Sequence, residues 1–191
     1  MIFCLSIMAY AQTPQDRATE LKKQAQSSLN QKDYIKARYL FKKAYEAFAS
    51  RENYPQAIEC GVQANALYVR ENFYKEGFEL CRDMEQLLWT GEQNKKKVFY
   101  DLRFLINKER LQMYTALKNP AQAKTQLDKL EEMANLAKND SLTEVLLYTK
   151  ANYYYTFNQS TQGDACFRKL INQYKDCLLY TSPSPRDRTR S

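Results

Sequence analysis

The 191-residue chain contains no histidine, which removes the most common general base and the most common side-chain ligand for transition metals. Only four glycines are present, and they form no Gly-rich loop of the kind that cradles phosphates. The sequence also has no Ser or Cys nucleophile motif, and acidic neighbours such as Glu131 and Glu132 do not face a common site on a helix. The composition therefore predicts a protein that is not an enzyme, with no catalytic residues, no metal site and no cofactor.

Cysteine is sparse in the central part of the chain, where only Cys60, Cys81 and Cys166 occur, without a C-x-x-C pair. Cys81 and Cys166 fall among apolar neighbours on predicted helix faces, where a thiol packs like a small hydrophobe. A disulfide between Cys60 and Cys81 is a less favoured alternative, because antiparallel pairing about Asn72 brings Cys81 closer to Gln63. The pattern predicts buried thiols and leaves this one bridge open.

The chain is basic, but its charge is not arranged for nucleic acid. The net charge is +7, of which the three arginines and one aspartate after position 185 contribute +2. Lysines and glutamates alternate along most predicted helices, and no basic stripe carries the interleaved aromatics that stack bases. We therefore expect no nucleic-acid partner.

Both ends of the chain differ from its middle. Residues 2–11 (IFCLSIMAYA) form an apolar run too short to span a bilayer, ending in a small-x-small cleavage pattern. This run predicts a signal peptide over residues 1–11 that lacks its positive N-terminal part, and thus an exported, periplasmic protein beginning at Gln12. The alternative is an apolar N-terminus on a cytosolic protein.

The last residues, 177–191 (CLLYTSPSPRDRTRS), resemble a translated sequencing adapter. Helical periodicity stops there and the two prolines break any helix, so we expect a disordered, artefactual tail. The alternative is a natural basic terminus. Residues 12–176 remain as one predicted domain, large enough to bury a continuous core.

A small residue recurs in one local setting, at Ala37, Gly77, Ala123 and Gly163, with spacings of 40, 46 and 40 residues. Bulky or apolar residues follow four and seven positions later, and a tyrosine precedes the last three small residues by nine positions. These companions are Phe41, Cys81, Leu127 and Phe167, then Ala44, Met84, Leu130 and Leu170, and the tyrosines Tyr68, Tyr114 and Tyr154. Each segment is long enough for two helices, so the register predicts four stacked helix pairs.

Cap and turn residues divide the chain into eight predicted helices. Asp33, Asn53 and Asn119 are expected to cap helices, the last two being followed closely by proline. Gly91 is expected to end the fourth helix in a left-handed conformation, and the segment 141–144 (SLTE) reads as a capping box for the seventh. The fifth helix is expected to begin near position 95 and the eighth to end near position 176.

The stretch Ala25…Tyr34-x-x-Ala37-x-x-x-Phe41-x-x-Ala44 resembles a tetratricopeptide repeat (TPR). The resemblance implies an all-α, right-handed α-solenoid of about four TPR-like pairs that binds a protein or peptide partner in a concave groove. Spacings of 40 and 46 residues exceed the usual length of about 34, and Asn65 and Leu111 stand where Ala25 gives the first repeat a small residue.

The TPR resemblance also implies a binding surface, because the first helix of each pair lines the groove in that family. Transferring the register places eight side chains there: Lys22, Gln26, Arg70, Lys108, Gln112, Tyr148, Asn152 and Tyr155. Gln26, Gln112 and Asn152 occupy equivalent places in their repeats. Their side-chain amides can form hydrogen bonds with the backbone of an extended peptide.

Lys22 and Lys108 resemble the lysines of the two-carboxylate clamp by which some TPR domains hold a peptide C-terminus. Ala66 stands where the middle asparagine of that clamp is expected. The alternative is that these are polar residues on a solvated helix face.

A more distant resemblance is to exported TPR regions of bacterial membrane-anchored signalling proteins, carried by the segments 151–155 (ANYYY) and 163–167 (GDACF). It implies that the chain is the sensor region of a truncated receptor, touching a membrane only through a missing C-terminal segment. The alternative is a stand-alone exported scaffold or envelope assembly factor. An apolar run of about 20 residues after Asp176 in the natural gene would favour the sensor. Ligand identity and oligomeric state are not encoded in any motif of the chain.

Overall fold

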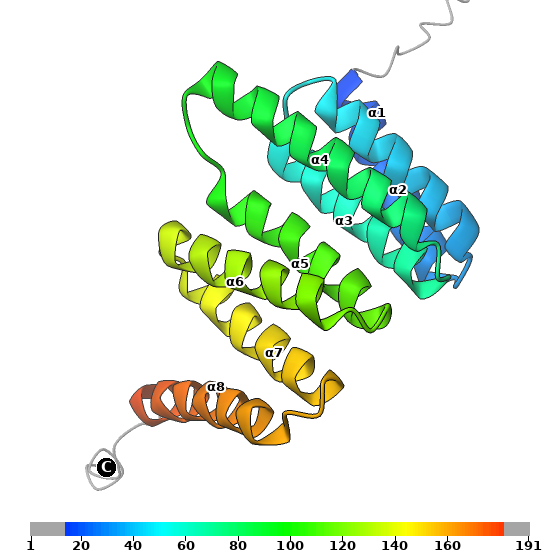
Figure 1. Cartoon of the computed structure of the whole chain (residues 1–191). Helices are drawn as coiled ribbons and strands as arrows, with labels where there is room; N and C mark the ends of the chain where they lie inside the picture. The colour runs from blue at the N-terminus through cyan, green and yellow to red at the C-terminus, as the bar shows by residue number, and fades with distance from the viewer. Residues whose placement is uncertain (1–13, 182–191) are drawn as a thin grey trace, which may run out of the picture. The chain divides into compact units, whose positions relative to one another are not determined.

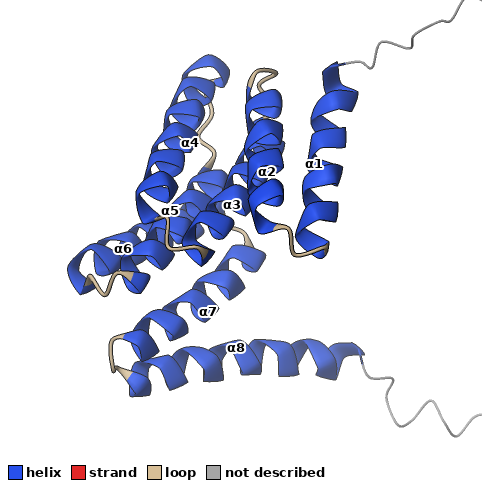
Figure 2. Ribbon diagram, turned by 90° about the vertical axis from the view of Figure 1, so that its right-hand side faces the viewer, coloured by secondary structure: helices blue, strands red, loops and turns tan. Residues whose placement is uncertain are grey.

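A computed structural model describes residues 14–181 of the chain, and over this range it forms eight α-helices and no strand (Figures 1 and 2). The helices are α1 (Pro14–Asn30), α2 (Tyr34–Ala49), α3 (Tyr54–Arg70), α4 (Tyr74–Lys95), α5 (Tyr100–Ala116), α6 (Pro120–Ala137), α7 (Asp140–Thr156) and α8 (Ser160–Thr181). The all-α helical-repeat fold expected from the sequence is confirmed. The expected signal segment (1–11) and the part of the expected tail from position 182 lie outside the described residues.

The helices form two compact units. The first contains α1–α4 and reaches Val98, and the second begins at Phe99 and contains α5–α8. Within each unit every helix packs against the next one along the chain, joined by loops of two to four residues, and in the second unit α5 also packs against α7. The two halves of each pair therefore run antiparallel. The right-handed sense of the solenoid stays a prediction.

One turn geometry recurs inside every helix pair. A residue with positive φ ends the first helix, and the backbone N–H after it donates to the carbonyl five residues back. The left-handed residues are Lys32 (φ 62°), Asn72 (φ 63°), Lys118 (φ 53°) and Asn158 (φ 58°). The bonds run from Asp33 to Ser28 (2.9 Å), Phe73 to Tyr68 (2.9 Å), Asn119 to Tyr114 (2.9 Å) and Gln159 to Tyr154 (2.8 Å). This is the Schellman motif, which satisfies carbonyls at the end of a helix.

The turn fixes the position along the first helix at which the second helix starts. Each small residue follows the turn's N–H donor by four positions, and all four small residues are buried. Ala37 and Ala123 are fully buried, and so are the bulkier Cys81 and Leu127 four positions after their small residues. The position of Ala25 is also buried in every repeat, including where it holds Asn65 in place of a small residue. The expected register therefore describes the core of both units.

Gly91 does not end α4, which is a correction to the sequence-based expectation. The helix continues to Lys95, and Lys96 takes the left-handed conformation (φ 48°) instead. Gly91 is buried, and a Cβ placed on it would lie 2.5 Å from the Tyr54 ring. Glycine is required there because an aromatic ring packs directly on the helix backbone, not because the chain turns.

Three other helix boundaries also differ from expectation. The cap of α7 is Asn139, whose Oδ1 accepts from the Ser141 N–H at 3.0 Å, so Ser141 is already helical. Helix α5 starts at Tyr100, after a loop that holds the remaining lysines of the expected helix start, and α8 continues to Thr181. Asp33, Asn53 and Asn119 cap their helices as expected.

Replacing Lys32 with glycine should stabilise the protein. A non-glycine residue in the left-handed region costs about 1–2 kcal/mol, and the larger backbone entropy of glycine in the unfolded chain offsets part of the gain, so Lys32→Gly should add about 0.5–1 kcal/mol. Lys23→Gly removes the same charge from an exposed position inside α1 and should cost about 1 kcal/mol. Urea denaturation of both variants measures the difference, and a loss of stability in Lys32→Gly would contradict the turn assignment.

Replacing Gln126 with leucine should also stabilise the protein. Gln126 is 4 % exposed, and its Oε1 has no hydrogen-bond partner among the described residues. The equivalent positions three residues after the small residue hold Leu40 and Leu80, both buried. An unsatisfied buried acceptor costs about 1–3 kcal/mol, so Gln126→Leu should raise the free energy of unfolding by about that amount.

The matched control for Gln126→Leu is the reverse change at the equivalent position, Leu80→Gln, which should destabilise the protein. If urea denaturation showed that both variants lose stability, the side chain of Gln126 would be satisfied and the equivalence of the two positions would not hold.

Candidate functional site

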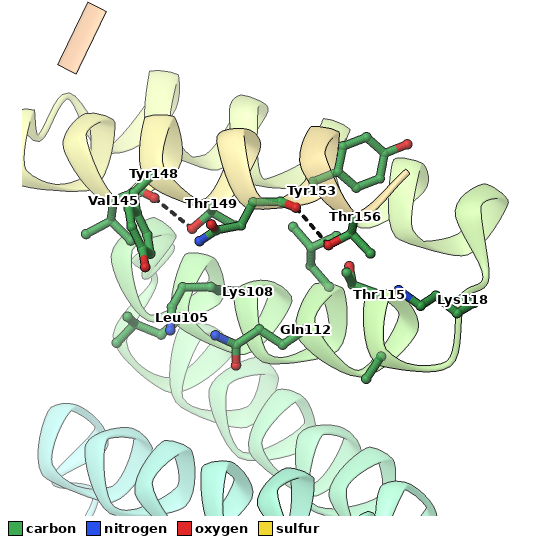
Figure 3. A pocket seen from close by; sticks show the side chains of 13 residues that line it. Leu105, Lys108, Gln112, Thr115, Lys118, Val145, Tyr148, Thr149, Tyr153 and Thr156 are labelled. Carbon is green, nitrogen blue, oxygen red and sulfur yellow. Dashed lines mark hydrogen bonds between the residues drawn. The ribbon is translucent and has the colours of Figure 1, made fainter. Parts of the chain in front are cut away.

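The second unit contains an open pocket of about 660 Å³ between α5 and α7, the first helices of the third and fourth pairs (Figure 3). The residues of α5 and its following turn that line it are Leu105, Lys108, Leu111, Gln112, Thr115, Ala116 and Lys118. Those of α7 are Val145, Tyr148, Thr149, Asn152, Tyr153 and Thr156. A pocket of this size suits a few residues of an extended peptide or a small molecule.

The two walls of the pocket correspond residue by residue, because α5 and α7 lie forty positions apart in the register. Leu105 matches Val145, Lys108 matches Tyr148, Gln112 matches Asn152 and Ala116 matches Thr156. Figure 3 shows Leu105, Val145 and Tyr148 toward one end, and Thr115, Thr156 and Lys118 toward the other, where Tyr153 also lies. The pocket therefore has an apolar end, a central pair of amides and a hydroxyl-rich end.

The central amides are available to a ligand. Neither Gln112 nor Asn152 forms a side-chain hydrogen bond with another described residue, and both are exposed. Two of the three threonine hydroxyls in the lining are already used as donors, because Thr149 Oγ1 donates to the Val145 carbonyl (2.7 Å) and Thr156 Oγ1 to the Asn152 carbonyl (2.9 Å). The amides are thus the side chains best placed to pair with a peptide backbone.

The pocket lining carries positive charge and no carboxylate. Lys108 and Lys118 line it, and no Asp or Glu does. Lys108 Nζ lies 3.2 Å from Glu109 Oε1, and the Glu109 side chain is almost fully buried beside it. Lys118, held in the turn, has no ion-pair partner among the described residues. The lining therefore favours neutral or acidic segments over basic ones.

The structure brings together four of the eight side chains that the sequence assigned to the groove. Lys108, Gln112, Tyr148 and Asn152 all line this pocket. The register alone placed them, since each sits at a matching level of a first helix. Sequence reasoning missed Leu105, Val145, Lys118 and the threonines, although the forty-residue offset between the matched walls could have indicated the first two.

The other assigned residues do not line the pocket. Three of them, Lys22, Gln26 and Arg70, belong to the first unit, where each side chain contacts another residue of that unit. Lys22 Nζ lies 2.7 Å from Glu59 Oε2 and 2.9 Å from Gln56 Oε1, which ties α1 to α3. Gln26 Nε2 donates to Asn30 at 3.1 Å. The positive charge of Lys22 is therefore paired within the folded chain, and the clamp-like arrangement stays a prediction.

Arg70 and Tyr155 are likewise engaged outside the pocket. The Arg70 guanidinium lies 4.1 Å from the centre of the Tyr34 ring, a cation–π contact. The Tyr155 hydroxyl donates to Asp164 on α8, and this bond raises the pKa of the phenol. Its ring lies 5.8 Å from that of Phe167. Tyr155 therefore joins α7 to α8 and does not line the pocket.

Other kinds of site are not assembled in the described part of the chain. No group of three His, Cys, Asp or Glu side chains could hold a metal ion between the ends of that range. None of the described helices combines the length and apolarity needed to cross a bilayer. The thiols Cys60, Cys81 and Cys166 are buried and form no disulfide, so the alternative bridge between the first two is not present.

Comparisons with protein-family models, with curated proteins and with solved structures each found no match. The TPR resemblance therefore rests on the sequence pattern, and membership of that family stays a prediction.

Stability should fall at alkaline pH, because burial raises the pKa of the Cys60 thiol to about 12 from an ordinary 9.0. The unfolded chain therefore loses this proton first, so the contribution is complete below pH 9 and decreases as the pH rises from 9 towards 12. Between pH 8 and pH 10, the free energy of unfolding measured by urea denaturation should fall less in Cys60→Ala than in the unchanged protein.

Tyr45 provides the control for this alkaline effect. Burial, with a smaller effect of Asp83, raises its pKa to about 12 from 10.0, so its contribution changes only above pH 10. Tyr45→Phe should leave the difference between pH 8 and pH 10 nearly unchanged. Equal losses in the Cys60→Ala variant and the unchanged protein would show that the thiol does not carry the effect.

Proposed function

We propose that this protein is a non-catalytic interaction module, and that its α5–α7 pocket binds an extended segment of a partner protein. The observation that carries the proposal is the pair of unengaged amides, Gln112 and Asn152, placed at matching levels on the two walls. A side-chain amide can donate to a backbone carbonyl and accept from a backbone N–H. Two of them across a pocket can hold one extended strand from both sides.

The lining of the pocket is better suited to binding a partner than to catalysing a reaction. It contains no carboxylate, thiol or histidine, which are the groups that most often act as general bases or nucleophiles. Leu105, Val145 and Tyr148 supply an apolar end for one side chain of the peptide, and Lys118 supplies a cation at the other. The favoured partner is therefore a peptide with an apolar residue and without excess positive charge.

The proposed setting is extracytoplasmic, and it rests on residues 2–11 alone. In the leading version the chain is the sensor region of a bacterial membrane-anchored signalling protein, and in the second it is a stand-alone exported scaffold or envelope assembly factor. Both versions use the same pocket. They differ in what the natural gene encodes after Asp176, so sequencing the gene across that codon distinguishes them.

The pocket can be tested with a random 12-residue peptide library displayed on phage and selected on the whole protein. We expect the double variant Gln112→Leu/Asn152→Leu to bind a selected peptide at least tenfold more weakly, because each lost hydrogen bond contributes about 1 kcal/mol. Fluorescence polarisation with the labelled peptide gives the two dissociation constants.

The matched control for the pocket is Gln86→Leu/Asn135→Leu, which makes the same two changes at exposed helical positions that do not line it. It should bind the selected peptide as the unchanged protein does. If both double variants bound equally, or if no peptide were enriched, the proposed function would be wrong.

A further inference from the structure

The first unit carries a second hollow, of about 420 Å³, on the exposed face of α2 beside the end of α3. Two large apolar side chains stand on it one helical turn apart, Ile35 and Tyr39, with 69 % and 61 % of their surfaces exposed. They are the two most exposed large apolar side chains among the described residues. A single exposed isoleucine is ordinary, but an adjacent pair at the edge of a hollow is typical of a contact surface.

One wall of this hollow is held rigid before any partner binds. The guanidinium of Arg38 lies 4.8 Å from the centre of the Tyr68 ring and 5.1 Å from that of Phe73, and it forms an ion pair with Glu71. Tyrosine and arginine are also the residue types most enriched at the centres of protein interfaces. Side chains fixed in this way lose little conformational entropy on binding.

The charges on the hollow favour an acidic partner. Arg38 is neutralised by Glu71, and Lys43 is neutralised by Glu46 at 2.8 Å. Lys42 also lines the hollow and has no ion-pair partner among the described residues. The uncompensated charge of the hollow is therefore one cation, on the same helical stripe as Ile35 and Tyr39.

We propose that this α2 face is a second docking surface, and that its occupant is a short amphipathic helix of a partner protein with an apolar residue followed by a carboxylate. Ile35, Tyr39 and Lys42 are spaced i, i+4 and i+7, so they form one row along α2. A second helix packed along this row places its apolar residue against Ile35 and Tyr39. A carboxylate one or two turns away then reaches Lys42.

This surface lies wholly in the first unit and shares no residue with the α5–α7 pocket. With both occupied, one chain holds two different segments, an extended one and a helical one. The inference is independent of the proposed function, and it is tested on the Gln112→Leu/Asn152→Leu protein so that peptides for the other pocket are not selected.

The test uses a yeast-displayed library of 18-residue, alanine-based helical peptides with randomised positions on one face. We expect enriched peptides to pair a large apolar residue with Asp or Glu one or two turns away. Tyr39→Ala and Lys42→Glu should each weaken binding at least tenfold. A peptide with lysine in place of its carboxylate should bind Lys42→Glu at least tenfold better than it binds the Lys42 protein.

The matched control is Lys23→Glu, which makes the same charge change at an exposed position of α1. Equal losses in Lys23→Glu and Lys42→Glu, absence of the charge-swap rescue, or enrichment of peptides without acidic residues would each overturn the proposal. Circular dichroism checks that every variant keeps its helices.

If the proposed occupant is wrong, two further measurements identify what binds to this face instead. The first is co-sedimentation with vesicles of 30 % phosphatidylserine and 70 % phosphatidylcholine. If the protein sediments with the vesicles and Tyr39→Ala abolishes this, the occupant is a membrane surface. Concentration-dependent dimers in light scattering that Tyr39→Ala abolishes would show a second copy of the chain.

Discussion

The fold of each helix pair depends on one backbone hydrogen bond, the bond that closes the turn between its two helices. In all four pairs the donor is the N–H that follows a left-handed residue, and the acceptor is the carbonyl five residues back. This bond sets where the first helix ends and the second begins, so the small residue arrives four positions later at the same level each time. The burial of Ala37 and Ala123 follows from that constant offset.

This dependence explains how much of the fold could be predicted from the sequence. The period and the caps at Asp33 and Asn119 are local features, and they gave the pairs and most boundaries. Asn72 and Asn158 belong to a residue type that favours positive φ, so those two turns could be predicted from residue type. The turns at Lys32 and Lys118 could not, because lysine does not favour positive φ and neither turn holds a glycine. Gly91 was misassigned because a helical glycine beneath Tyr54 and a glycine that ends a helix look alike in sequence.

For the candidate site too, the sequence predicted features that depend on the repeat register and missed those that depend on tertiary contacts. The transferred register placed Lys108, Gln112, Tyr148 and Asn152 on one face of the first helices, and these four side chains line the pocket. It could not predict that Lys22 meets Glu59 or that Tyr155 meets Asp164, because those contacts depend on side chains of neighbouring helices. Long polar side chains bind the nearest opposite charge or acceptor, and the repeat pattern does not specify it.

The two proposed surfaces recognise a partner by different physics. Unengaged amides pair with peptide backbone, which every sequence has, so the α5–α7 pocket discriminates mainly through its apolar end. The α2 face offers Ile35, Tyr39 and Lys42, which contact side chains, so its discrimination comes from apolar fit and charge. A pocket that binds peptide backbone accepts partners of many sequences, whereas a face that contacts side chains selects partners by their sequence. A chain with both is suited to hold one selected protein while it engages exposed segments of others.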